Sequence, residues 1–128
     1  MTDYLIDTNV LVDAIRQKNK RWELLEALVS GGGGLACSAV TIGEIWAGMR
    51  SHERPRTEQF LAEFRQYDVT SEIAREAGRL KNEWMAKGRT LTLADTMIAA
   101  TAILHKLVLV TANTKDFPMR EIRLYSRM

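Results

Sequence analysis

The chain of 128 residues is 46% hydrophobic and 27% charged, proportions typical of a globular protein. Its length fits one domain with its own core, which we expect to cover residues 1–128. The net charge of +2 is too small to indicate a nucleic-acid partner by itself. The single cysteine, Cys37, excludes an internal disulfide, and no apolar run reaches the roughly 18–20 residues that span a bilayer. We therefore expect a cytoplasmic protein with no membrane contact.

Hydrophobic periodicity predicts strands and helices that alternate along the chain. In order, we expect a strand at 3–6, helices at 8–16 and 20–30, a flexible turn at 31–34, a strand at 35–38, helices at 40–50 and 56–66, a short strand at 67–69, helices at 71–87 and 92–105, and strands at 107–110 and 122–125. This alternation predicts an α/β fold with a central, mostly parallel sheet of about five strands and helices on both faces.

Three acidic residues stand where apolar segments meet polar ones. Asp7 follows the first strand, Glu44 lies in the helix after the second strand, and Asp95 opens the apolar helix at 92–105. Ligands of such folds bind beyond the carboxyl ends of the strands, so the three acids are predicted to meet at one edge of the sheet. The sequence places no Lys or Arg to pair with all three, and a bound divalent cation would account for them together.

Two of these acids also have a local explanation. Asp7 is placed to cap the helix that follows it, and Asp95 stands three residues after Thr92, as in a capping box. Glu44 lies within a helix and has no capping role. Polar residues after the late strand can serve a turn or the same site: Thr111, Asn113 and Asp116.

Basic residues form three clusters, each of which can contact phosphates or simply be solvated. Lys87 and Arg89 flank Gly88 shortly before the third acid. The other clusters contain Arg16, Lys18, Lys20 and Arg21 in the first case and Arg50, Arg54 and Arg56 in the second.

Four stretches together resemble the PIN domain family, and within it the VapC-type ribonuclease toxins of toxin–antitoxin pairs. Each stretch is weak alone, but they follow the family's order and spacing and cover nearly the whole chain. They are 5–11 (LIDTNVL), 38–44 (SAVTIGE), 93–102 (LADTMIAATA) and 109–117 (LVTANTKDF).

The resemblance implies a metal-dependent endoribonuclease. The family's metal-binding acids would correspond to Asp7, Glu44 and Asp95, and its fourth acidic position falls on Asn113. Asparagine offers a carbonyl oxygen without a negative charge, so a second metal would be held less firmly there. Asp116 is a further candidate, able to supply a carboxylate directly or through a water.

The implied cofactor is Mg²⁺ or Mn²⁺, which prefers oxygen ligands. It would activate a water for in-line attack on an RNA phosphodiester. Asn9 and Thr111 resemble positions that orient the acids, and Lys87 and Arg89 are candidates to hold the RNA backbone. The resemblance implies tRNA, ribosomal RNA or messenger RNA as substrate, and nothing in the sequence selects among them.

The resemblance also implies two protein partners: a VapB-type antitoxin that covers the site, and a second copy of the chain in a homodimer. The segment 46–64 is rich in large apolar residues, which can form a groove for an antitoxin helix or pack two short helices on each other. These residues are Trp46, Met49, Phe60, Leu61 and Phe64.

Two other functions remain open. The substitution at Asn113 favours a PIN fold that binds RNA or protein with little catalysis. A phosphoacceptor domain of the receiver type is also α/β, with acids at the strand ends. It requires paired acids after the first strand, whereas here only Asp7 ends that strand, because Asp3 lies at its start.

Overall fold

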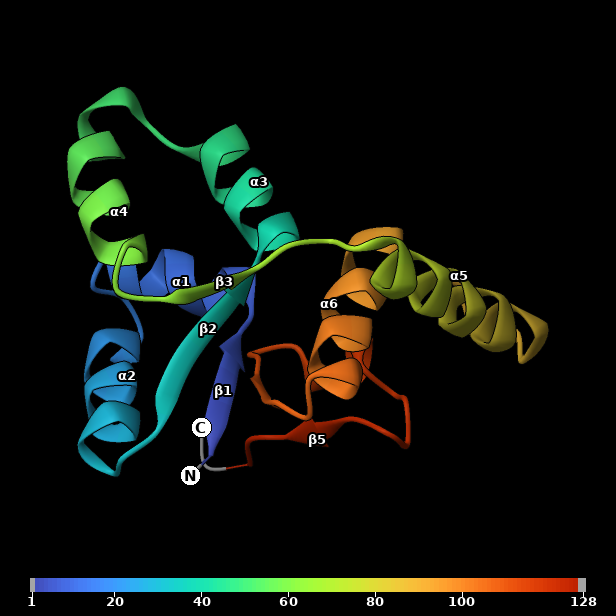
Figure 1. Ribbon diagram of the computed structural model, residues 1–128. Coiled ribbons are helices and arrows are strands. Elements are labelled where there is room, and N and C mark those ends of the chain that lie inside the picture. Colours follow the sequence, from blue (N-terminus) through green and yellow to red (C-terminus); the bar gives the residue numbers. More distant parts are fainter. Residues whose placement is uncertain (1, 127–128) are drawn as a thin grey trace.

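The computed structural model describes residues 2–126, in which five parallel strands form one sheet in the order β3-β2-β1-β4-β5 (Figure 1). The predicted fold class is confirmed, with every strand parallel to its neighbours. The order differs from the 2-1-3-4-5 order of receiver domains, which argues against that alternative. The strands are β1 (Asp3–Ile6), β2 (Gly34–Ser38), β3 (Arg65–Tyr67), β4 (Val108–Val110) and β5 (Arg123–Leu124).

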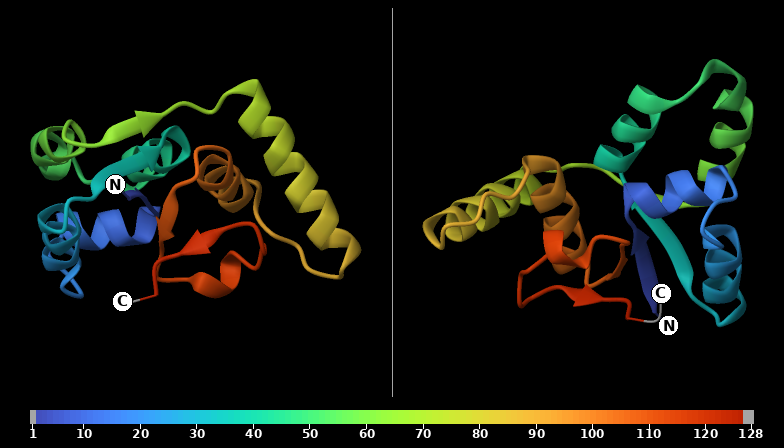
Figure 2. Two further views of the ribbon diagram at one scale, coloured as in Figure 1. Left: turned by 60° about the horizontal axis from the view of Figure 1, so that its bottom comes forward. Right: turned by 180° about the vertical axis from the view of Figure 1, so that it is seen from behind.

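Helices cover both faces of the sheet (Figures 1 and 2). One face carries α1, α2 and α4, the opposite face carries α5 and α6, and α3 stands at the carboxyl edge, where it contacts α1 and α6. No helix within residues 2–126 is long and apolar enough to cross a bilayer. The helices are α1 (Thr8–Ile15), α2 (Arg21–Ser30), α3 (Ala39–Gly48), α4 (Arg54–Leu61), α5 (Ser71–Ala86) and α6 (Leu93–Leu104), with short 3-10 turns η1 (Ser51–Glu53) and η2 (Thr114–Asp116).

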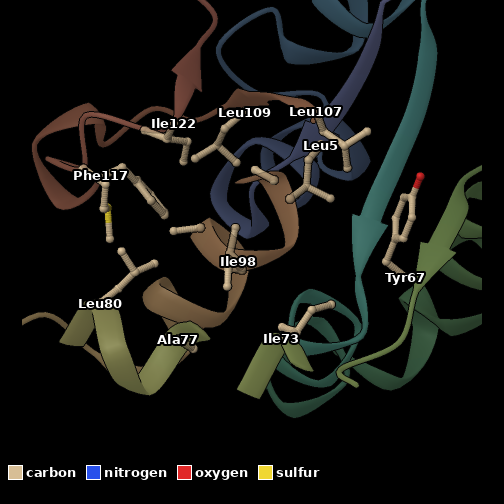
Figure 3. Close-up of a cluster of buried hydrophobic side chains, with 14 of the residues drawn as sticks. Leu5, Tyr67, Ile73, Ala77, Leu80, Ile98, Leu107, Leu109, Phe117 and Ile122 are labelled. Carbon is tan, nitrogen blue, oxygen red and sulfur yellow. The ribbon is translucent and has the colours of Figure 1, made fainter. Parts of the chain in front are cut away.

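Alternating residues of the central strands supply two cores. Leu5 and Leu109 point into the core under α5 and α6 (Figure 3), whereas Ile6 and Val110 point into the core under α1, α2 and α4. All four are fully buried, and each such side chain contributes about 1.5–3 kcal/mol. Cys37 also lies in the second core, as expected, and burial raises the pKa of its thiol to about 11.

The predicted helix at 56–66 and strand at 67–69 were wrong in their bounds. Helix α4 ends at Leu61, and the Gln66 side-chain amide donates to the Leu61 carbonyl, which satisfies one acceptor at the helix end. The chain then enters β3, where Arg65 pairs with Ala36 and Tyr67 with Ser38. Arg65 and Gln66 are exposed because β3 is an edge strand. Since both residues are polar, the hydrophobic pattern of the sequence did not predict a strand at these positions.

Candidate active site

The candidate site lies where the chain changes direction across the sheet, between the carboxyl ends of β1 and β4. Asp7 directly follows β1 and Thr111 directly follows β4, and the two strands are neighbours. The Asp7 backbone N–H donates to the Val110 carbonyl at 2.9 Å, which fixes the two strand ends together. Such a switch point is the usual ligand site of an open α/β sheet.

Asp7 is the most enclosed acid of the site, with 5% of its surface exposed. Its Oδ1 accepts the Thr8 backbone N–H at 2.8 Å, and its Oδ2 accepts the Thr111 hydroxyl at 2.7 Å. The Asn113 backbone N–H in turn donates to the Thr111 oxygen at 3.1 Å. Asp7 therefore caps α1, as the local explanation predicted, and is also held rigidly at the sheet edge.

Glu44 lies on α3 with an exposed side chain, and its Oε1 is 2.6 Å from the Thr8 hydroxyl oxygen. The Thr8 oxygen is also 3.1 Å from the hydroxyl of Thr41, which is fully buried. A hydroxyl has one proton and an ionised carboxylate only accepts, so Thr41 donates to Thr8 and Thr8 donates to Glu44. Thr8 thus contacts two acids, through its backbone and its hydroxyl.

Sequence reasoning missed Thr8 and Thr41. A signal was present, because Thr41 precedes Glu44 by three residues and so shares its face of the helix. Thr8 directly follows Asp7, where a capping carboxylate brings the next residue close.

Asp95 lies in the first turn of α6, partly exposed. Its backbone N–H donates to the hydroxyl of the N-cap residue Thr92 at 3.1 Å. The capping explanation therefore holds for this bond. The Asp95 side chain is also near enough to Asp7, Asp116 and Glu44 for their charges to raise its pKa.

The pKa values of Asp7 and Asp95 are both raised, chiefly because burial penalises the charged carboxylate. Hydrogen bonds oppose this effect, from Thr111 and Thr8 at Asp7 and from the Thr92 side chain at Asp95. Repulsion from neighbouring acids adds to the increase: Glu44 and Asp116 act on Asp7, and Asp7, Asp116 and Glu44 act on Asp95.

The four carboxylates therefore share one electrostatic environment, and Asp116 is the acid that the η2 segment contributes to it. Asn113 caps η2, and its backbone carbonyl accepts the Asp116 N–H at 3.0 Å. Among residues 2–126, no Lys or Arg forms an ion pair with any of these four acids.

The donor set fits Mg²⁺ or Mn²⁺ in chemistry and in charge. Carboxylate and amide oxygens are the ligands these ions prefer, and within residues 2–126 no ion pair neutralises the shared negative charge. In the described part of the chain, no three Asp, Glu, His or Cys side chains are already grouped closely enough to hold a metal. Mg²⁺ usually keeps several waters and uses one or two carboxylates directly, so a preformed cage of three is not required.

The remaining predicted residues have other contacts. Lys87 pairs with Glu83 at 3.6 Å and lies over the Trp84 ring, 4.5 Å from its centroid. Arg89 donates to the backbone carbonyl of Lys115 in η2, the residue before Asp116. Asn9 is exposed in the first turn of α1. The RNA-binding role of Lys87 and Arg89 and the orienting role of Asn9 stay predictions.

Comparisons with known proteins show the family of the chain. The family model for the PIN domain matches residues 4–122. Ribonuclease VapC19 of Mycobacterium tuberculosis is 36% identical over 115 residues, which cover 90% of this chain and 92% of the relative. Ribonuclease VapC10 of the same organism is 37% identical over 117 residues, covering 91% and 87%.

Solved structures show the same fold over nearly the full length. VapBC2 from Rickettsia felis, bound to a DNA fragment from its promoter, gives a TM-score of 0.85 at 25% identity and covers 97% of this chain and 98% of that one. A toxin–antitoxin complex from Klebsiella pneumoniae gives 0.79 at 32% identity and covers 96% of each chain.

Proposed function

Because this chain belongs to the PIN domain family, with VapC ribonucleases among its relatives, we propose that it is a metal-dependent endoribonuclease and the toxin of a toxin–antitoxin pair. One observation carries the proposal: Thr8 joins Asp7 and Glu44 at the carboxyl edge of the sheet, Asp95 and Asp116 add to the negative charge there, and among residues 2–126 no Lys or Arg forms an ion pair with these four acids. A phosphodiester is itself negative, so these acids can serve its hydrolysis only with a cation between them and the substrate.

Each site residue has a distinct part in the proposed reaction. Bound Mg²⁺ or Mn²⁺ supplies positive charge to the phosphate and lowers the pKa of a water. Asp7 and Asp95 would be its central ligands, and the Thr8 and Thr111 bonds fix the direction in which the Asp7 oxygens point. Glu44 is held through one oxygen by Thr8, which leaves the other to orient the attacking water.

The proposed substrate is a single-stranded loop of a structured RNA, either tRNA or ribosomal RNA. Unpaired nucleotides can be drawn into a cleft, whereas a duplex cannot. A VapB-type antitoxin is the proposed inhibitor, since the Klebsiella structure is a toxin–antitoxin complex. The homodimer and the cytoplasmic location are likewise parts of the proposal.

The test is a cleavage assay with purified chain and bulk tRNA or ribosomal RNA, first in EDTA and then with Mg²⁺ or Mn²⁺ restored. We expect cleavage by wild type only with metal, and none by Asp95→Asn. Asp68→Asn is the matched control, because Asp68 is an exposed acid outside the site. RNA binding without cleavage at any metal concentration would instead support a binding module.

A further inference from the structure

Two basic clusters that are far apart in the sequence meet in one pocket, which we call the basic pocket. Arg16 and Lys18 reach it from the end of α1, and Arg50 and Arg56 reach it from the segment around η1 and the start of α4. Glu53 is the acid in its wall. Four cations therefore face one carboxylate, and the pocket carries excess positive charge.

That single carboxylate is already occupied. Glu53 binds Arg16 through two bonds, of 3.0 Å from Nε and 3.3 Å from Nη2. The bond with Arg16 lowers the pKa of Glu53 to about 2, so the pair stays ionised at neutral pH. Among residues 2–126, Lys18, Arg50 and Arg56 form no ion pair, and their charges are left for a ligand.

The pocket wall is held in a fixed shape. Arg56 donates to the Ile15 carbonyl at 2.9 Å, which ties α4 to the end of α1. In the loop after α1, Gln17, Asn19 and Lys20 adopt φ angles of 55°, 56° and 56°, in the left-handed region that is uncommon for residues other than glycine and asparagine. The Lys18 backbone N–H nevertheless donates to the Asp13 carbonyl at 2.7 Å, which holds the loop there.

The basic pocket adjoins a cavity that reaches one acid of the site, Glu44. A second cavity shares Arg16 and Glu53 with the basic pocket, is walled by Val12 and Met49, and reaches Glu44 at its other end. Helix α1 begins at the acid site and ends at the basic pocket, and its eight residues span about 12 Å. An RNA strand at the acids can therefore follow this helix to the cations.

We propose that the basic pocket binds a backbone phosphate of the RNA substrate, a few nucleotides from the bond that is cleaved. This inference rests on the proposed ribonuclease function and names the part of the chain that holds the substrate. Phosphate is favoured over other ligands because the pocket offers several unpaired cations and lies on a path from the acids. An acidic peptide is the competing occupant, and the test separates the two.

The experiment measures binding of fluorescently labelled bulk tRNA to the full chain carrying Asp95→Asn, which prevents cleavage. Into this background we introduce Lys18→Gln with Arg50→Gln, which keeps the Arg16–Glu53 pair and the bond from the Arg50 backbone N–H to Glu53. The matched control is Arg75→Gln with Arg120→Gln. These two arginines are exposed and lie outside the pocket, so the control removes the same charge elsewhere.

We expect the pocket variant to bind tRNA several-fold more weakly than the control variant. The slope of log Kd against log salt concentration should be smaller for the pocket variant by about 0.7–1, which is the effect of losing one phosphate contact. With Asp95 restored and Mn²⁺ present, KM for RNA cleavage should rise while kcat stays unchanged, because a remote contact binds substrate and transition state equally.

Equal tRNA binding by the pocket and control variants would overturn the proposal. A competition experiment with the unsubstituted pocket gives a second such outcome. If polyglutamate displaces tRNA as effectively as polyphosphate of the same charge, the occupant is an acidic peptide and the proposal is wrong. If wild type cleaves RNA but the two variants bind alike, the pocket fails and the proposed function stands. If the pocket variant alone loses tRNA affinity but wild type never cleaves, the proposed function fails instead.

Discussion

Acidic residues gather in two regions of this molecule, under opposite electrostatic conditions. On the surface beside α5, Arg79 contacts the carboxylates of three acids, and two of them, Glu76 and Glu83, raise its pKa. At the sheet edge, Asp7 and Asp95 have raised pKa values, because burial and neighbouring acids oppose their charge. The three acids around Arg79 are Glu76, Glu83 and Glu121.

The difference bears on the proposed metal site. The acids around Arg79 are paired with cations of the protein, with Arg79 and, at Glu83, also with Lys87, and their exposure keeps these interactions weak and sensitive to salt. Asp7 and Asp95 at the sheet edge are partly desolvated, so repulsion between the acids there is stronger than between acids on the surface. The predictions below test whether this contrast separates a functional site from surface charge.

The largest effect is expected from Asp7→Asn. This change keeps the size of the side chain but removes the charge of the most enclosed acid. We expect RNA cleavage to fall by more than about 100-fold, because changes even to residues that only support metal ligands cost 10–100-fold. The measurement is the single-turnover cleavage rate at saturating Mn²⁺.

Circular dichroism and thermal unfolding of Asp7→Asn must show a folded protein for this result to count. Asp13→Asn is a suitable control, since Asp13 is also on α1 but contacts Asn19 instead of the site. Full activity of folded Asp7→Asn would remove Asp7 from the metal site.

A smaller effect is expected from the hydroxyls that hold Glu44. Thr41→Val keeps the shape of a fully buried side chain and removes the proton donated to Thr8. Thr8 then loses part of the polarisation that strengthens its bond to Glu44. We expect Mn²⁺ affinity, measured by isothermal titration, to fall by about 10-fold.

Two further variants show whether the hydroxyl or the packing matters. Thr41→Ser keeps the donor and should retain most of the affinity. Thr101→Val makes the same chemical change at another fully buried threonine, whose hydroxyl donates to the Met97 carbonyl at 2.8 Å within α6. Equal losses of Mn²⁺ affinity in Thr41→Val and Thr101→Val would show a general effect of packing.

The raised pKa values also predict a pH effect on the metal-free protein. The folded state binds protons at Asp7 and Asp95 more tightly than the unfolded state does. Their contribution to stability is therefore fully present below the unfolded pKa, near 3.8, and is lost as the pH rises through the higher folded pKa.

Denaturant unfolding in EDTA at a series of pH values measures this contribution. The difference in free energy of unfolding between wild type and the double variant Asp7→Asn/Asp95→Asn isolates it from other groups, such as Glu53. We expect wild type to lose stability relative to the double variant as the pH rises from about 4 towards neutrality. A difference that does not change with pH would contradict the sign of the two shifts.

Much of this site could be predicted from the sequence, and the reason lies in where each signal is located. Asp7 and Asp95 stand beside strong apolar segments, so the periodicity that located the strands and helices also located them. Thr111 followed from its place after a buried strand. These residues depend on local patterns, which a single sequence contains.

The parts that could not be predicted depend on contacts across the fold. The Thr8–Glu44 bond joins residues 36 positions apart, and the Arg16–Glu53 pair joins residues 37 apart. The end of α4 was misplaced for a related reason, because β3 is defined by its pairing with β2. Each of these contacts depends on which segments, distant in the sequence, become neighbours in the folded chain.

The smallest effect is expected from Arg79→Gln, which removes the cation that Glu76, Glu83 and Glu121 share and leaves only the pair of Lys87 with Glu83. We expect a loss of less than about 1 kcal/mol in stability, because these are exposed pairs. We expect no change in RNA cleavage and no second Mn²⁺ site, since water already screens carboxylates that are exposed. A new Mn²⁺ site in the titration of Arg79→Gln would show that unneutralised acids alone suffice. Burial at the sheet edge would then not be what distinguishes Asp7 and Asp95 from surface charge.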